Sequence, residues 1–253
     1  MEVHHHPQLH HQPKPWKEYL LEGLMIFIAV AMGFFAESFR ENLVENTMER
    51  EAIKSYVEDL KSDTAAIRIE LLFLREKRMV RVDSLMFLLE NKNIKGYENQ
   101  LYYYGRTLIR SVPYQSNDRT IRQLKNSGTF RVIRNKQAVD SIISYDKLLE
   151  TLNISQANEK RERDEAKPIL SQIFSPFEFD KIVTKNGGIN AITRPTDNPP
   201  LSSYDPKLQL QLAFSVHMIK GSLYLITSGL EELNAKAKNN ITFLKKAYHL
   251  ENE

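Results

Sequence analysis

Metal chemistry is suggested first by five histidines at the start of the chain. They are His4, His5, His6, His10 and His11. Neutral imidazole is a common ligand of divalent cations. Three prolines in the same stretch, Pro7, Pro13 and Pro15, prevent a helix from holding these side chains in one arrangement. Metal binding and a flexible tail both stay open, and we predict a flexible tail over residues 1–15 with no assigned metal ligand.

The segment from Arg106 to Lys136 contains eight basic residues and one acidic residue, Asp118. Guanidinium groups bind phosphates and carboxylates through paired hydrogen bonds, so an acidic partner, an anionic lipid or a cell-wall polymer could contact this segment. The four candidate contacts are Arg119, Arg122, Arg131 and Arg134. In the alternative that we favour, these arginines pair inside the molecule. The acidic candidates there are Glu70, Glu76, Glu90 and those of segment 158–165.

The sequence contains none of the short motifs that mark common catalytic sites. A Walker-type glycine loop, H-E-x-x-H, G-x-S-x-G and G-x-G-x-x-G are all missing. The absence of cysteine excludes disulfides, thiol catalysis and cysteine-bound metals. We therefore predict that the protein is not an enzyme and has no cofactor. The net charge of +3 is small, so nothing in the overall charge calls for nucleic acid as a partner.

Two groups of charged residues are interpreted as solvated helix faces. Glu58, Asp59 and Asp63 lie among lysines on one predicted helix, and segment 158–167 is almost wholly charged. His217, beside an apolar seam, is interpreted as a structural histidine. None of these residues is assigned a functional role.

One apolar stretch near the start, residues 16–39, organises the rest of the chain. Its charge-free part, residues 23–36, spans only about 21 Å as a helix, whereas a bilayer core is about 30 Å thick. Extending the helix to residues 19–39 gives about 21 residues, which is sufficient to cross. The longer span includes Glu22 and Glu37, both near its ends, where carboxylates can reach water.

The flanks of this stretch favour a membrane. Trp16 and Tyr19 suit one bilayer interface and Phe39 the other, so we predict a transmembrane anchor over residues 16–40, with lipid around it. A buried core helix is the alternative. A cleaved signal peptide is disfavoured because no small-x-small cleavage site is evident. Gly33 and the alanine four residues before it would let two anchors approach closely.

The body, residues 41–253, is predicted to consist of long helices. Apolar residues recur at steps of three and four from position 53 to 88, a spacing typical of a bundle or coiled-coil seam. No proline or glycine lies between Gly33 and Gly96, so one helix should run from the membrane to a stop at 91–96. The predicted fold class is all-α, with a transmembrane helix that continues into a bundle of long helices.

Shorter helices and one loop are expected next. The helices cover residues 97–112, 117–128 and 135–167. Asn117 or Asp118 is expected to cap the second of them, with Gly128 just past its end. Pro168 is expected to kink or end the third, and residues 186–206, rich in proline and glycine, form a loop.

The last helix carries the most regular seam. Its apolar positions are 212, 216, 219, 223, 226, 230 and 233, continued by Ala237, Ile241, Leu244 and Tyr248. This seam is longer than the helix over 135–167 can cover. Its end could be covered by the early part of the first long helix or by a second copy of the chain. The Ala29/Gly33 pair in the anchor favours the second copy, so we predict a homo-oligomer.

Three stretches resemble known bacterial sequences. They read MEVHHH, WKEYLLEGLMIFIAVAMGFFAESFREN and SYVEDLKSDTAAI, and they lie within the first 67 residues. They are similar to a family of uncharacterised single-pass membrane proteins common in the Bacteroidota. The later segment TIRQLKNSGTFRVIRNKQAVDSIISY resembles a motif of related uncharacterised bacterial membrane proteins. The resemblance implies that the histidine run is native and supplies no activity.

Together these features predict a membrane-anchored helical scaffold or interaction protein without a catalytic site. The predicted location is the bacterial inner membrane, with the tail inside and the body in the periplasm, where other envelope proteins could bind it. One alternative is a ligand-sensing helical bundle that acts through a membrane partner. A hydrolase or transferase with a dispersed site is the third possibility.

Overall fold

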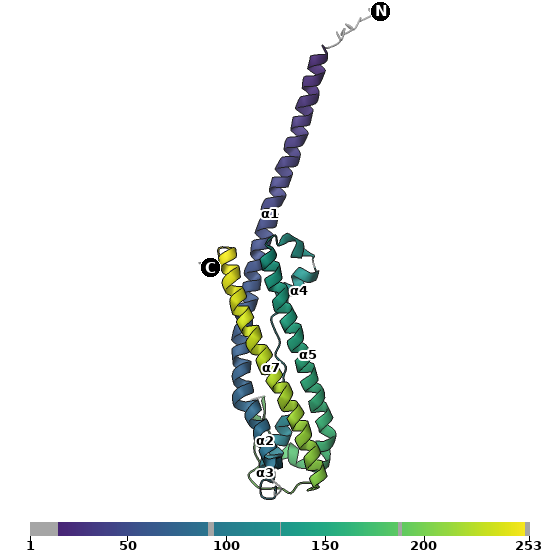
Figure 1. Ribbon diagram of the computed structural model, residues 1–253, viewed down its shortest axis with the longest axis vertical. Coiled ribbons are helices and arrows are strands. Elements are labelled where there is room, and N and C mark those ends of the chain that lie inside the picture. Colours follow the sequence, from purple (N-terminus) through teal and green to yellow (C-terminus); the bar gives the residue numbers. More distant parts are fainter. Residues whose placement is uncertain (1–14, 91–93, 127, 187–188, 251–253) are drawn as a thin grey trace, which may run out of the picture. The chain divides into compact units, whose positions relative to one another are not determined.

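Helices form most of the structure, so the predicted all-α class is confirmed (Figure 1). The computed structural model describes residues 15–90, 94–126, 128–186 and 189–250 of the 253-residue chain. The five histidines of the predicted tail therefore lie outside the described residues. Within the described part of the chain, the only sheet is one two-stranded hairpin.

The first helix is long because the sequence offers nothing to break it. Helix α1 runs from Trp16 to Phe73 and continues through a π-helical turn, η1 (Leu74–Met79), into α2 (Val80–Glu90). The predicted continuous helix is thus confirmed up to Glu90. Its expected stop at 91–96 is partly outside the described residues, and Gly96 there adopts a positive φ of 90°.

Up to Glu51 the chain forms a unit of its own, which contains the apolar part of α1. This helix is long and apolar enough to cross a membrane, and none of its apolar window is buried. A signal sequence near the N-terminus would satisfy the same two criteria. Trp16, Tyr19 and Phe39 are all more than half exposed, and the open surroundings of Gly33 leave space beside the helix.

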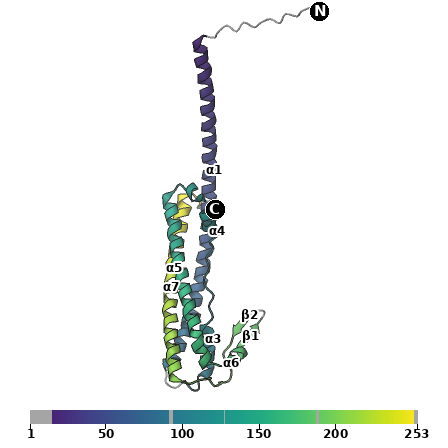
Figure 2. The ribbon, with the colours of Figure 1, turned by 90° about the vertical axis from the view of Figure 1, so that its right-hand side faces the viewer.

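From Ala52 onward the chain forms a second unit, in which long helices lie side by side (Figures 1 and 2). They are the remainder of the first helix, α5 (Lys136–Ile173) and α7 (Pro206–Ala247). Helices α5 and α7 are antiparallel. Near the end of α7, the Asn240 side chain donates a 2.9 Å hydrogen bond to the backbone carbonyl of Ser141, near the start of α5.

The predicted seams form the core of this bundle. Each seam residue of α7 between Leu212 and Leu233 is at most 3% exposed. In the first helix, Ile53, Leu74 and Leu85 are fully buried. Burial of apolar surface contributes about 25 cal/mol per Å², so these continuous seams supply the main stabilisation of the body.

The end of the α7 seam does not need a second copy of the chain to cover it. Leu244 is fully buried, and Ile241 and Tyr248 are partly buried and pack against the same core. The end of the α7 seam is therefore covered by this chain itself. A homo-oligomer remains a prediction, but it needs another surface.

The fourth side of the bundle is built from α3 (Glu98–Leu108), an irregular segment 110–118 and α4 (Arg119–Asn126). The prediction of a helix up to residue 112 was wrong, because α3 ends four residues earlier. Pro113 explains part of this, since proline disfavours helical backbone in the residue before it. Gly128 adopts φ 66°, the left-handed conformation that a glycine just past a helix adopts without strain.

Of the two expected effects of Pro168, the end of the helix does not occur, because α5 continues to Ile173, and a kink stays a prediction. The start of α5 agrees, since the Asn135 side chain accepts hydrogen bonds from the backbone N–H groups of Gln137 and Ala138. Pro168 is exposed, so the loss of its N–H leaves no buried group unpaired.

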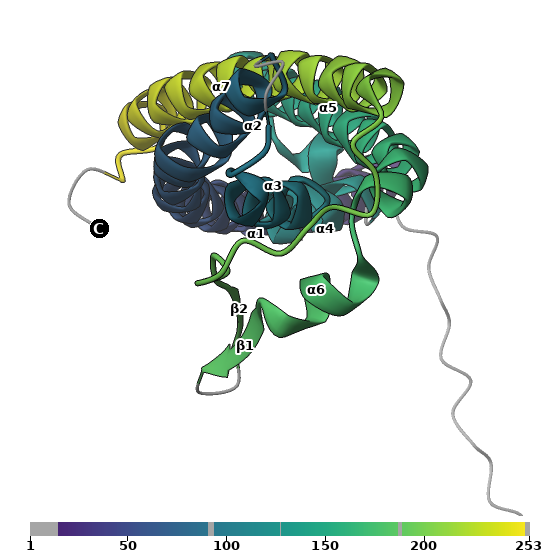
Figure 3. The ribbon, with the colours of Figure 1, turned by 90° about the horizontal axis from the view of Figure 1, so that it is seen from below.

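The predicted loop contains part of a hairpin that sequence reasoning missed. After α6 (Pro176–Lys181), strand β1 (Val183–Asn186) pairs antiparallel with β2 (Ile189–Ile192), with Asn186 opposite Ile189. The sequence Asn-Gly-Gly at 186–188 is typical of a tight hairpin turn. In the end-on view, α6 and the hairpin lie outside the ring of long helices (Figure 3).

Helix α7 is apolar on a second face. Leu210, Phe214 and Leu225 are each at least 65% exposed, and Met218 is 42% exposed. At 3.6 residues per turn these side chains lie on the side of the helix opposite its buried seam. The first half of α7 therefore presents apolar side chains both to the core and to the outside.

Candidate functional site

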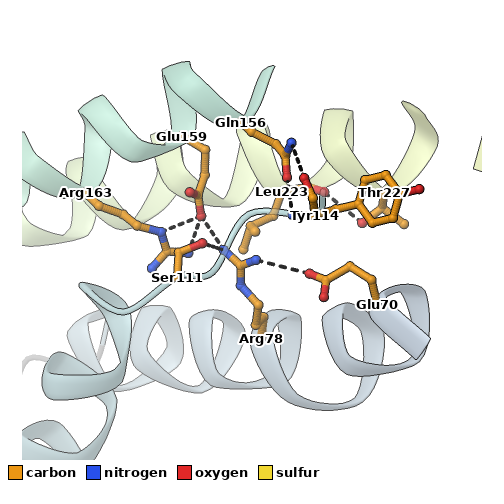
Figure 4. A network of polar contacts seen from close by, with 9 residues as sticks. All are labelled: Glu70, Arg78, Ser111, Tyr114, Gln156, Glu159, Arg163, Leu223 and Thr227. Carbon is orange, nitrogen blue, oxygen red and sulfur yellow. Dashed lines mark hydrogen bonds and ion pairs between the residues drawn. The ribbon is translucent and has the colours of Figure 1, made fainter. Parts of the chain in front are cut away.

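The most unusual side chain in the core is Arg78, which lies on η1 at a seam position and is 8% exposed. Its guanidinium donates hydrogen bonds of 2.5 Å to Glu159 and 2.8 Å to the Ser111 hydroxyl. A second guanidinium nitrogen lies 3.7 Å from Glu70. Figure 4 shows this network between η1, segment 110–118 and α5.

The α5 side of the network is an ion pair one helical turn apart. The Arg163 guanidinium donates to the same Glu159 carboxylate, which therefore bridges two arginines. Glu159 is 2% and Arg163 is 4% exposed. The interpretation of segment 158–167 as a solvated face was wrong for these two residues.

The cluster has two arginines and two carboxylates, of which only one, Glu159, is fully buried. Arg78 and Arg163 share one fully buried carboxylate, and Glu70 is a more distant, partly exposed partner. Burial lowers the pKa of Arg78 and raises the pKa of Glu70, although Arg78 opposes the latter effect. The Nε atom of Arg78 is buried and makes no hydrogen bond with the residues that the structure describes.

Two cavities meet at this cluster, and Arg78, Ser111 and Arg163 line both. One has a volume of about 200 Å³ and reaches towards α2, α3 and β2. The other has a volume of about 510 Å³ and lies along α5. Space remains here because an irregular chain fills the fourth side, where a helix with its side chains would be about 10–12 Å wide.

The cavity linings are rich in charged and polar side chains. They contain arginines, lysines and amides together with the carboxylates of Glu70, Glu159 and Asp164. The Ser111 hydroxyl accepts from Arg78, which cannot take up a proton. The arrangement therefore offers hydrogen-bond donors and positive charge to an oxygen-rich anion.

A second buried cluster holds the segment that leads into α4. Asp59 accepts hydrogen bonds from the Thr120 N–H (2.8 Å), the Asn117 side chain (2.8 Å) and Arg119 (3.0 Å). Asp63 accepts from the Asn117 N–H at 2.7 Å and the Tyr145 hydroxyl at 2.6 Å. Both carboxylates are 2% exposed, so their interpretation as a solvated face was wrong.

This cluster also corrects the predicted cap. The carboxylate that satisfies a free N–H of the first turn of α4 comes from Asp59 on α1, not from the side chain of Asn117 or Asp118. Burial raises the pKa of Asp63, and the hydrogen bonds from Tyr145 and Asn117 oppose that shift. The cluster binds the chain to itself and lines only a very small cavity of about 10 Å³.

The four arginines of the predicted anion contact have different surroundings. Arg119 pairs with Asp59, and Arg122 pairs with Asp118 one turn away in α4. The side chains of Arg131 and Arg134 are exposed. The acids suggested as internal partners meet other bases instead, since Glu70 and Glu159 lie at Arg78. Contact of the four arginines with an external anion stays a prediction.

A signal for the buried cluster was present in the sequence. Apolar residues of α5 recur at steps of three and four up to Leu152. The same steps lead on to three polar residues, Gln156, Glu159 and Arg163, and a further step of seven reaches Leu170. Arg78 likewise occupies a seam position of the first helix. Charged residues that fall on seam positions of two helices are candidates for a buried ion pair.

Among the described residues there is no group of three or more histidines and carboxylates that could hold a metal ion. No protein-family model, curated protein or solved structure matches this chain. The resemblance to a Bacteroidota membrane family therefore stays a prediction. What the fold and the site define is a class: an all-α bundle with a buried cluster of arginines and carboxylates, joined to a helix long enough to cross a membrane.

Proposed function

We propose that this is a single-pass protein of the bacterial inner membrane that works by binding other molecules rather than by catalysis. The observation that carries this proposal is the exposure of the apolar part of α1. None of its apolar window is buried, and most of its large apolar side chains from Leu20 to Phe35 are at least half exposed. Water would solvate such a surface poorly. In the proposed orientation the tail is inside and the body is in the periplasm.

We expect the full-length protein to stay in the membrane fraction after alkaline carbonate extraction, and its mass to include residues 1–40. The physical reason is that a helix of this length and composition partitions into a bilayer. A mature protein that starts after residue 40 would identify the helix as a cleaved signal instead. Protease added to intact spheroplasts should digest the body, and full protection would reverse the orientation.

The proposed interaction surface is the outward face of α7, formed by Leu210, Phe214, Met218 and Leu225. Exposed apolar stripes of this kind are typical of protein contact surfaces. We propose a second copy as the occupant, because the stripe itself contains no charge and the open site of Gly221 at its middle allows two helices to approach.

Changing Phe214 and Leu225 together to Asp should convert the oligomer to monomers and leave the helical circular dichroism signal unchanged. Both side chains point away from the core, so their replacement does not disturb the buried seam. Sedimentation in lipid nanodiscs measures the outcome. Ile154→Asp is the matched control, because Ile154 is an exposed apolar residue that lies on α5, outside the proposed surface. A wild-type protein that is monomeric at micromolar concentration would contradict the proposal.

A ligand-sensing bundle is the second candidate function. The observation that favours it is the pair of cavities that meet at Arg78 and Arg163. In this reading the bound ligand alters the body, and a membrane partner carries the signal onward. A ligand-dependent change in what co-purifies with the full-length protein would support this function.

A further inference from the structure

We propose that the cavities around Arg78 and Arg163 bind a small organic dianion, whose carboxylate or phosphate groups are held by these arginines and by two lysines at the rim. The inference rests on the second candidate function, the ligand-sensing bundle, and supplies its ligand class. It requires no membrane partner, so binding can be measured separately from signalling.

The first support is the charge of the linings. The 510 Å³ cavity has four basic residues, Arg78, Lys160, Arg163 and Lys167, against Glu159 and Asp164. The 200 Å³ cavity has four arginines against one acid, Glu70. Positive charge in a concave, partly buried surface concentrates anions, because the field there is less screened than on an open surface.

The second support is the unsatisfied donor at the centre. Arg78 is more than nine-tenths buried, lines both cavities, and its buried Nε atom has no acceptor among the described residues. Leaving a charged donor without an acceptor is costly. Because the Nε atom is closed off from the cavities, an oxyanion would accept from it only after a shift of the Arg78 side chain, and this shift would give the donor an acceptor.

The third support is the division of the bases into two pairs. Arg78 and Arg163 lie at the buried end, whereas the side chains of Lys160 and Lys167 are 76% and 52% exposed. Hydrogen bonds from both lysines lower the pKa of Asp164 to about 2, so this rim carboxylate is ionised and offsets one of the two lysine charges. Two separated cationic pairs match a ligand with an anionic group at each end.

The volume sets the size of the ligand. A cavity of 510 Å³ lies within the range of about 300–1,000 Å³ that is usual for small-molecule sites. Gln156 is fixed at its wall by hydrogen bonds with the backbone of Tyr114, at 2.6 Å to the N–H and 3.2 Å to the carbonyl. This part of the wall is therefore preformed, and the volume is large enough for a short dicarboxylate or a phosphate.

The test uses the full-length protein in nanodiscs of zwitterionic lipid, titrated calorimetrically with succinate and, separately, with inorganic phosphate. We expect saturable binding of at least one of them with one site per chain. Succinamide, which is neutral, and potassium chloride at equal ionic strength should give no saturable heat. Binding of succinate alone identifies a carboxylate ligand, and binding of phosphate alone a phosphate ligand. Absence of both would overturn the proposal.

Three variants locate the site. Changing Lys160 and Lys167 together to Gln should weaken binding by about tenfold. Ala157→Phe adds no charge and should block binding by filling the 510 Å³ cavity that Ala157 lines. The matched control is Lys181→Gln, which removes a similar exposed ion pair with Glu178 away from both cavities. Equal affinity in all variants, or equal loss in the control, would contradict the site.

Discussion

Glu159→Ala is expected to lower the free energy of unfolding by about 3–5 kcal/mol. The carboxylate of Glu159 is the acceptor shared by Arg78 and Arg163, and all three side chains are at least 92% buried. Removing it takes this carboxylate from Arg163 and leaves Arg78 with only the more distant Glu70, at 3.7 Å. Urea denaturation followed by circular dichroism at 222 nm measures the change.

Glu165→Ala is the control for this prediction. It lies on the same helix and pairs with Arg161 at 3.9 Å, but both side chains are more than two-thirds exposed. The expected change is within about 0.5 kcal/mol. An equal loss in the two variants would show that helix propensity, not the buried charge, is responsible.

A triple variant separates stability from binding. Changing Arg78 to Met, Glu159 to Leu and Arg163 to Met removes every buried charge of the cluster at once. Such replacements are neutral or stabilising by about 1–4 kcal/mol in well-packed cores. We expect this variant to fold and to lose succinate or phosphate binding. Retained binding in the folded triple variant would exclude the cluster as the site.

Asp59→Ala is expected to lower the free energy of unfolding by about 3 kcal/mol. One carboxylate on α1 accepts from the Thr120 N–H, from Asn117 and from Arg119, and all three bonds are lost together. The Thr120 N–H is buried, so water cannot replace its acceptor without opening the segment. Hydrogen exchange of the amides of α4 should accelerate along with the loss of stability.

Glu58→Ala, at the preceding residue, is the matched control. Its carboxylate is exposed and accepts a 2.6 Å hydrogen bond from Lys61 one turn away. We expect a change within about 0.5 kcal/mol. If the two variants differ by less than that, Asp59 does not hold α4 and the role assigned to it is wrong.

The buried faces of the helices were predicted correctly where apolar residues recur at steps of three and four. The positions from 53 to 88 and from 212 to 233 predicted which faces of the first helix and of α7 are buried, because helical geometry alone determines them. Composition likewise predicted the long uninterrupted helix up to Glu90.

The site was missed because charged residues were assigned to solvent on composition. Arg78, Glu159 and Arg163 occupy seam positions, but the partners of Arg78 are more than 30 residues away in the sequence. Arg163 pairs with Glu159, four residues before it, so the distant contact of the cluster is the one between Arg78 and Glu159. The same is true of Asp59, whose partners Asn117, Arg119 and Thr120 lie about 60 residues away, in the irregular segment and at the start of α4. A single sequence gives the position of such a residue on its helix, but not the partner that makes its burial possible.

The π-helical turn at Leu74–Met79 makes the first helix tolerant of changes in its length. Such a turn accommodates one residue more than the α-helical pattern requires. Loss of one residue there could be absorbed by a return to regular α-helix, with the helix still continuous. The helix beyond that point would keep its orientation, and Val82 and Leu85 would still face the core. Loss of one residue from a regular part of the helix would instead turn everything beyond it by about 100° about the helix axis.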